Sequence, residues 1–185
     1  VLARAHVAGF LDGGVLPVIK HTPGHGRAKA DSHLSLPVVE ASRKELAAHD
    51  FPPFAAFADA PMAMTAHVVY TALDKEAPAT LSARVIGQVI RKQIGFNGLL
   101  MTDDLSMKAL TGSFEERTLR ALKAGCDVVL HCNGDMAEMA EVAAAAGPLK
   151  GKSLRRARLA LKMARKPQRF DRKAALKDLE VLVTG

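Results

Sequence analysis

Residues 82–106, SARVIGQVIRKQIGFNGLLMTDDLS, decide the fold class of this 185-residue chain. The segment 82–94 has the spacing of an amphipathic helix, with a serine able to cap its start and a glycine just after its end. An apolar run over residues 98–102 follows and predicts a buried strand. Two carboxylates, Asp103 and Asp104, come directly after that strand. A helix followed by a buried strand is the repeating unit of an α/β protein.

The same alternation extends through most of the chain. Buried strands are predicted over residues 15–19, 62–66, 98–102 and 127–131. Helices are predicted over residues 2–12, 42–49, 82–94 and 113–125, with two or three more after the last strand. Single helices between strands predict right-handed βαβ units and therefore a parallel sheet.

Two folds can be built from four such units. Four βα units followed by C-terminal helices are about the second half of a TIM (β/α)8 barrel, which typically needs about 250 residues. A four-stranded doubly wound sheet is the alternative, and the pattern alone does not separate the two. In a barrel, active sites lie at the C-terminal ends of the strands. Polar residues follow all four predicted strands, at Lys20-His21, His67, Asp103-Asp104 and His131-Cys132-Asn133.

The composition argues against several classes of protein. The formal net charge is +7, but the chain has no Trp and one Tyr, so nucleic-acid binding by aromatic stacking is not expected. Much of the positive charge lies between Lys150 and Lys177, and we interpret it as the solvated face of a helix. Attraction of phosphates or of an anionic membrane surface is the less favoured interpretation. No run of eighteen apolar residues predicts a membrane span.

The cysteines and the first residue bear on location and on completeness. Cys126 and Cys132 are too few for a disulfide framework and lack a zinc spacing, so we expect reduced thiols in a cytosolic protein. The chain starts at Val1 inside a helical pattern, and we expect it to belong to a longer protein.

A first cluster of chemically capable residues lies in KHTPGHG, residues 20–26, and continues to Asp31 and His33. Histidine exchanges protons near neutral pH, and a carboxylate two residues away can fix its tautomer and raise its basicity. A metal site formed by His21, His25 and His33 is the alternative, but spacings of four and eight match no strong metal signature. A purely structural loop is less favoured still, because such loops rarely contain so many ionisable groups.

A second cluster is the carboxylate pair at the end of the third predicted strand. Adjacent strand residues point to opposite faces, so at most one of the two need point to the barrel axis. We expect Asp104 to cap the following turn. Asp103 is then a carboxylate at a strand end, opposite a protonatable histidine. A retaining glycosidase needs a nucleophile and a separate acid/base, and these two groups can supply them.

The segment VIRKQIGFNGLLMTDDLS, residues 89–106, resembles the signature of family 3 glycoside hydrolases. In that signature the aspartate after a serine or threonine is the nucleophile, which implies this role for Asp103. Residues 20–26 with Asp31-Ser32-His33 resemble the N-acetylhexosaminidase branch of the family, which recycles peptidoglycan. The resemblance runs over nearly all of residues 1–147. Thr22 departs from it, standing where an apolar residue is more usual, and we expect little effect.

The resemblance also implies roles for the first cluster. A mobile loop brings in His33 as the general acid/base, with Asp31 as its partner, and Lys20 and His21 bind the N-acetylglucosamine ring. The implied activity is the release of terminal β-linked N-acetylglucosamine from small carbohydrates such as muropeptides, in the bacterial cytoplasm. No metal, cofactor or protein partner is expected. Substrate assistance by the acetamido oxygen is an alternative within the chemistry.

The resemblance implies that residues 1–185 are part of a family 3 N-terminal-type barrel domain whose first four βα units are missing. We therefore expect the isolated chain to be inactive, although Asp103, His33 and Asp31 are all present. A non-catalytic half-barrel that binds sugar or anionic partners is the competing interpretation, and the intact catalytic residue types argue against it.

Overall fold

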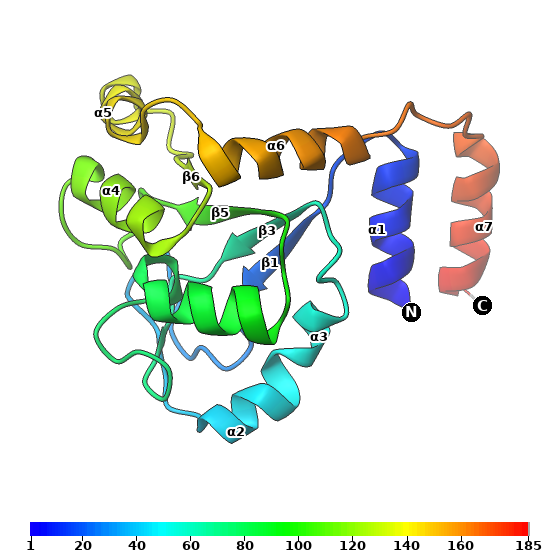
Figure 1. Ribbon diagram of the computed structural model, residues 1–185. Coiled ribbons are helices and arrows are strands. Elements are labelled where there is room, and N and C mark those ends of the chain that lie inside the picture. The colour runs from blue at the N-terminus through cyan, green and yellow to red at the C-terminus, as the bar shows by residue number, and fades with distance from the viewer. Residues whose placement is uncertain (185) are drawn as a thin grey trace.

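Four parallel strands form the centre of the molecule in the computed structural model, which describes residues 1–184 (Figure 1). They are β1 (Val18–Thr22), β3 (Met62–Thr65), β5 (Leu99–Asp104) and β6 (Val128–Leu130). The strands pair in the order β1-β3-β5-β6, and every pair is parallel. In a doubly wound sheet the strand order reverses at a switch point. Here it never reverses, so the sheet is a segment of a (β/α)8 barrel, and this resolves the alternative that the sequence left open.

Helices connect the strands and cover the sheet. They are α1 (Leu2–Asp12), α2 (Arg43–Glu45) running into η1 (Leu46–Asp50), α3 (Pro52–Ala55), η2 (Ala79–Leu81), η3 (Val85–Gln93), α4 (Phe114–Ala124), α5 (Met136–Ala146), α6 (Gly151–Met163) and α7 (Arg172–Thr184). A separate parallel pair, β2 (Val38–Val39) with β4 (Val69–Tyr70), was not predicted. No helix among residues 1–184 is both long enough and apolar enough to cross a membrane.

The first strand differs from its prediction. Residues 15–19 were expected, but β1 begins at Val18 and runs through His21 to Thr22. The N–H of Val15 donates to the carbonyl of Phe10 at 2.8 Å and so completes the end of α1. Pro17 has no N–H to donate to a ladder. The prediction that a loop begins at residue 20 was therefore wrong, and the polar residues end the strand itself.

The two helices that precede β5 and β6 begin and end where their sequences predict. Ser82 accepts a hydrogen bond from the N–H of Val85 at 3.0 Å, and Gly95 ends that helix with φ of 82°. Ser113 and Glu116 cap α4 reciprocally, and Gly125 ends it with φ of 116°. Four apolar side chains of η3 lie in the main core, Val85, Ile86, Val89 and Ile90.

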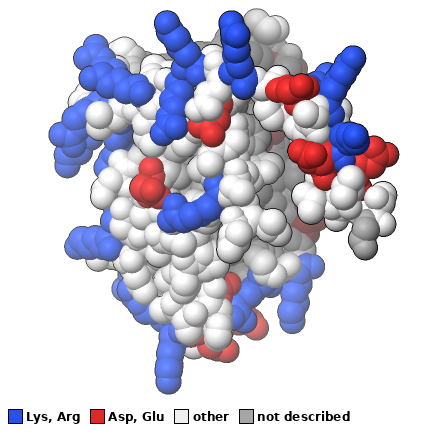
Figure 2. Space-filling model, turned by 90° about the vertical axis from the view of Figure 1, so that its right-hand side faces the viewer, with Lys and Arg blue, Asp and Glu red and all other residues white. Residues whose placement is uncertain are grey.

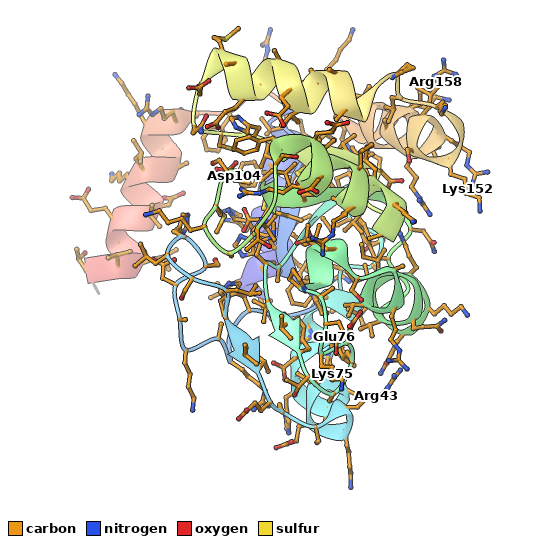
Figure 3. The ribbon with its side chains drawn as sticks, turned by 90° about the vertical axis from the view of Figure 1, so that its left-hand side faces the viewer. Arg43, Lys75, Glu76, Asp104, Lys152 and Arg158 are labelled. Atoms are coloured by element: carbon orange, nitrogen blue, oxygen red, sulfur yellow. The ribbon has the colours of Figure 1, made fainter. Side chains whose placement is uncertain are left out.

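A buried carboxylate joins several elements at the N-terminal ends of the strands. Asp127, 3% exposed, accepts hydrogen bonds from Arg91 at 2.7 Å and from Arg156 at 2.9 Å. It also accepts one from the N–H of Leu100 at 2.9 Å. Arg156 belongs to the basic run that was interpreted as a solvated face. That interpretation holds for Lys152 and Arg158, which are exposed on α6 (Figure 3), but not for Arg156.

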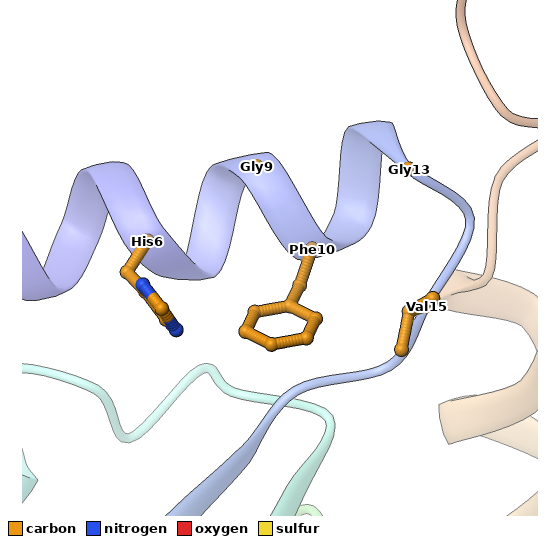
Figure 4. A pocket seen from close by; sticks show the side chains of 5 residues that line it. All are labelled: His6, Gly9, Phe10, Gly13 and Val15. Atoms are coloured by element: carbon orange, nitrogen blue, oxygen red, sulfur yellow. The ribbon is translucent and has the colours of Figure 1, made fainter. Parts of the chain in front are cut away.

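Apolar surface remains uncovered at one end of the molecule. Helices α1 and α7 stand beyond the sheet (Figure 1), and a shallow groove of about 390 Å³ runs along α1 beside His6, Phe10 and Val15 (Figure 4). Exposed apolar side chains line α7, at Leu176, Leu179, Leu182 and Val183. Viewed from that end, Lys and Arg side chains spread around the rim rather than gathering in one patch (Figure 2).

Candidate active site

Strands β1 and β5 bring the two predicted clusters together. The C-terminal ends of parallel strands lie at the same edge of a sheet, and β3 separates these two strands. At that edge the Nε2 atom of His21 lies 3.4 Å from the Oδ2 atom of Asp103. The strand ends therefore converge on a carboxylate–imidazole contact.

Both strands bulge where their functional residues lie. Between Ile19 and Thr22, β1 has one residue more than β3 has between Ala63 and Thr65. The pairing of β5 with β6 is irregular in the same way, between Met101 and Asp104. A bulge turns side chains away from simple alternation and is common beside active sites. The bulged residues are Lys20-His21 in β1 and Thr102-Asp103 in β5.

A single open pocket contains all five residues that the sequence predicted. Its volume is about 430 Å³, and it is lined by Lys20, His21, His25, Gly26, Asp31, Ser32, His33 and Asp103. The loop that follows β1 folds back over the strand ends and contributes the residues from His25 to His33. A monosaccharide needs a cleft with convergent polar groups, and this pocket supplies them.

The loop places Asp31 and His33 in direct contact. The Oδ1 atom of Asp31 accepts hydrogen bonds from the Nδ1–H and from the backbone N–H of His33, both at 2.9 Å. These two bonds, the backbone one first, hold the pKa of Asp31 below its usual value. With Nδ1 donating to the carboxylate, Nε2 is the ring atom of His33 left to exchange a proton with a bound molecule.

The surroundings of His21 favour its neutral imidazole form. Burial lowers its pKa, the nearby Asp103 carboxylate opposes that shift, and the ammonium of Lys20 adds to it. A neutral ring can donate from Nε2 to Asp103 without carrying a full charge. Lys20 is exposed at the pocket rim, where its ammonium can donate to hydroxyl groups.

Asp104 is a capping residue, as the sequence predicted. Its carboxylate accepts hydrogen bonds from the N–H of Ser106 at 3.0 Å, from the Ser106 hydroxyl at 2.6 Å and from the N–H of Cys132 at 3.1 Å. Burial raises its pKa, but the hydrogen bonds from Ser106 and Cys132 and the charge of His131 together outweigh burial, and the net shift is downward. Asp104, labelled in Figure 3, thus links the turn after β5 to the loop after β6 through these hydrogen bonds.

Three contacts that the sequence did not predict hold the pocket loop. The hydroxyl of Tyr70 donates to the carbonyl of Gly24 at 2.6 Å, and Arg27 pairs with Asp50 at 2.8 Å. Ser32, between the two dyad residues, is 5% exposed, and its hydroxyl lies 3.5 Å from Nε2 of His25. The one tyrosine of the chain is the only sequence signal that could have pointed to this anchoring.

The other polar residues predicted to follow strands lie outside the pocket. His67 is fully buried beneath it, and His131 pairs with Glu138 at 2.8 Å beyond β6.

Two histidines of the pocket lie close to each other. The rings of His21 and His25 are 5.5 Å apart, centroid to centroid. Among residues 1–184 no three His, Cys, Asp or Glu side chains are grouped closely enough to hold a metal ion.

Residues 1–165 match the family model described as the glycosyl hydrolase family 3 N-terminal domain. The β-hexosaminidase of Alkalilimnicola ehrlichii is 46% identical over 136 residues, which are 71% of this chain and 39% of that protein. The family 3 β-N-acetylglucosaminidase of Paenibacillus sp. str. FPU-7 superposes with a TM-score of 0.77 at 29% identity, over 90% of this chain and 35% of that one. NagZ of Neisseria gonorrhoeae superposes with a TM-score of 0.70 at 30% identity, over 93% of this chain and 47% of that one. The chain thus spans about two fifths of the curated relative's length, and it belongs to glycosyl hydrolase family 3 through that family's N-terminal domain.

Proposed function

We propose that the full-length protein containing this chain is a retaining β-N-acetylhexosaminidase that releases terminal β-linked N-acetylglucosamine. The observation that carries the proposal is the pocket in which Asp103, the Asp31–His33 dyad, Lys20 and His21 meet. A nucleophilic carboxylate and a separate proton donor are the two groups that retaining hydrolysis requires. The names of the relatives support the choice of sugar.

In the first step, the ionised Asp103 carboxylate attacks the anomeric carbon. A covalent glycosyl ester forms as the bond to the leaving oxygen breaks, and Nε2–H of His33 protonates that oxygen. Asp31 stabilises the imidazolium and holds its orientation through Nδ1. Hydrogen bonds from His33 lower the pKa of Asp31 and so favour its charged carboxylate.

In the second step, His33 acts as a general base. Its neutral Nε2 removes a proton from water, the hydroxide attacks the anomeric carbon, and the ester bond to Asp103 breaks. Two displacements at one carbon leave the sugar with its original β configuration. Lys20 contributes hydrogen-bond donors to the sugar in both steps. His21 binds the sugar through the ring nitrogen that does not face Asp103, and its contact with Asp103 orients the nucleophile.

We further propose small peptidoglycan fragments, muropeptides, as the natural substrates. The proposal is supported by the resemblance of residues 20–33 to the branch of the family that recycles peptidoglycan and by the likeness of the fold to NagZ. Cys126 and Cys132 are unpaired thiols, which fits a reducing compartment such as the bacterial cytoplasm.

Residues 1–185 are, in this proposal, the second half of a (β/α)8 barrel. Within the described residues β1 pairs only with β3, and β6 pairs only with β5, so both edges of the sheet are open. In a closed barrel such edges are paired and the inner faces pack in layers from all eight strands. The isolated chain should therefore self-associate and lack hexosaminidase activity. Sedimentation and an activity assay test this, and a monomeric, active 185-residue protein would refute the half-barrel assignment.

The activity itself is tested on the full-length protein with two chromogenic substrates. We expect turnover of 4-nitrophenyl N-acetyl-β-glucosaminide and little turnover of the β-glucoside that lacks the acetamido group. Proton NMR of the first product formed should show the β anomer. Formation of the α anomer would exclude the double-displacement mechanism. Binding of N-acetylglucosamine without any turnover would favour a binding module instead.

A further inference from the structure

A buried histidine lies directly beneath the candidate nucleophile. His67 follows β3, is 0% exposed and contributes nothing to the pocket wall. Its Nε2 atom lies 3.0 Å from the backbone carbonyl oxygen of Asp104, and its Nδ1 atom lies 2.7 Å from the hydroxyl of Thr80. Both ring nitrogens are therefore occupied, and one of them contacts the residue next to Asp103.

The partners of His67 determine its tautomer. A carbonyl oxygen can only accept, so Nε2 holds the proton and donates it to Asp104. Burial lowers the pKa of His67, which favours the neutral ring, and in that form Nδ1 can only accept from the Thr80 hydroxyl. The same Thr80 hydroxyl also lies 3.1 Å from the Ala66 carbonyl and 2.8 Å from the Thr65 hydroxyl, so its one proton is shared between two acceptors while Thr65 can donate to it. The carbonyl of Asp104 is therefore the partner that places the proton on Nε2.

The His67 contact holds β5 where its backbone ladder does not. The last registered pair between β3 and β5 is Met64 with Met101, so no ladder pair with β3 fixes residues 102–104. On the other side of β5 the bulge interrupts the pairing, and the Leu130 N–H donates to the Thr102 hydroxyl at 2.9 Å instead of to a carbonyl. Backbone pairing with β6 resumes at Asp104, where the Leu105 N–H donates to the Leu130 carbonyl at 2.8 Å, so side chains supplement the ladder over residues 102 and 103.

The Asp104 backbone transmits this constraint to Asp103. Its carbonyl accepts from His67, while its N–H donates to the Oδ1 atom of Asp103 at 2.9 Å. The other carboxylate oxygen of Asp103, Oδ2, faces His21 at 3.4 Å. The peptide that carries this carbonyl is also held by the Leu105 N–H, which donates to the Leu130 carbonyl at 2.8 Å. Loss of the donor on His67 removes one of these two restraints, so the end of β5, and with it the Asp104 N–H, is held less firmly.

We propose that His67 is a positioning residue for the reaction, whose Nε2–H holds the bulged end of β5 so that the Asp103 carboxylate is aimed at the anomeric carbon. The inference rests on the proposed role of Asp103 as nucleophile. A misplacement of about 1 Å at a reacting group can cost about 10²-fold in rate. Because His67 does not reach the pocket, its loss should affect the chemical step rather than sugar binding.

Two substitutions in the full-length enzyme separate positioning from packing. His67→Phe keeps a ring of similar volume without a donor, and His67→Gln keeps a donor near the Nε2 position. We expect the Phe variant to lower the rate of glycosyl-enzyme formation by about 10- to 100-fold with KM changed by less than about twofold. The Gln variant should recover most of that rate. Rates are expressed per active site, titrated with a slow fluorosugar, so that misfolded protein does not count.

Two threonine substitutions provide a second test, which is needed if the His67→Phe variant does not fold. Thr80→Val removes the donor to Nδ1 of His67, and we expect glycosylation to slow by several-fold at unchanged KM. Thr118→Val is the matched control, because the Thr118 hydroxyl is buried on α4 and has no partner among residues 1–184. Full rate per active site in His67→Phe or in Thr80→Val would overturn the inference. Absence of a covalent label on Asp103 in the unmodified enzyme would instead refute the proposed function.

Discussion

Asp31 and His33 are joined twice, by the ring Nδ1–H and by the backbone N–H of His33, and both hydrogen bonds end on the same carboxylate oxygen at 2.9 Å. Only two positions separate the residues along the chain, so this geometry is closed locally. Both side chains are more than half exposed, at 58% and 75%. Asp31 and His33 can therefore move together with their loop while both hydrogen bonds between them stay intact.

Removal of the His33 side chain should affect substrates according to their leaving groups. His33→Ala should lower kcat/KM by about 10²- to 10⁴-fold for alkyl or sugar leaving groups, because these need protonation. Activated aryl glycosides should lose much less, since a phenolate with a low pKa leaves without an acid. Steady-state kinetics over a series of leaving groups checks this. An equal loss for every leaving group would show that His33 has a structural role.

Asp31→Asn should give a milder form of the same pattern. The amide can keep a hydrogen bond to His33 but cannot stabilise the imidazolium by its charge. The leaving-group dependence should be visible but smaller than that of His33→Ala. Asp59→Asn is a suitable control, because Asp59 is an exposed carboxylate with a 4.0 Å contact to Arg4. An Asp31 variant with the kinetics of the control would remove Asp31 from the mechanism.

Conformational stability should fall as the pH is lowered through about 6.5, the ordinary pKa of histidine. Burial lowers the folded-state pKa of both His21 and His67. Between the folded value and 6.5, the unfolded chain binds more protons, so the free energy of unfolding decreases as the pH decreases. Urea titrations of the full-length protein at several pH values measure this slope. His67→Gln removes one of the two groups, so an undiminished slope in that variant would contradict the assignment.

Thr22 offers a test of the buried strand end. Its side chain is 1% exposed, and the hydroxyl has no hydrogen-bond partner among residues 1–184. Thr22→Val should therefore raise the free energy of unfolding by about 1 kcal/mol, because an unsatisfied buried hydroxyl is removed. Thr65→Val is the matched comparison, since its equally buried hydroxyl bonds to Thr80 at 2.8 Å. That change should lower stability by about 1 kcal/mol. Destabilisation of similar size at both sites would show that Thr22 has a partner.

The sequence predicted the order of the elements because helix caps, glycines and apolar runs are local signals. The predicted helix start at Ser82 and the predicted helix ends at Gly95 and Gly125 are all confirmed. Strand order is a non-local property, so the barrel could not be separated from a doubly wound sheet by periodicity. The start of β1 was missed because Val15 completes a helix, a competition that hydrophobicity alone does not reveal.

The residues of the candidate site could be predicted from the sequence, but their spatial arrangement could not. Lys20, His21, Asp31, His33 and Asp103 were all identified from residue type, spacing and family resemblance, and one pocket contains them. The bulges that present them depend on pairing with neighbouring strands, which the sequence pattern does not show. No role was predicted for His67, because its partners come from two other elements.

The central claim is that Asp103 forms a covalent bond to the sugar. The direct measurement treats the full-length enzyme with a slow fluorosugar analogue of N-acetylglucosamine and locates the label by peptide mass spectrometry. We expect one sugar per active site, attached to Asp103, with no label in the Asp103→Asn variant and normal labelling in Asp104→Asn if that variant folds. A label on Asp104, or turnover with retention and no covalent intermediate, as substrate assistance by the acetamido group would give, would contradict it.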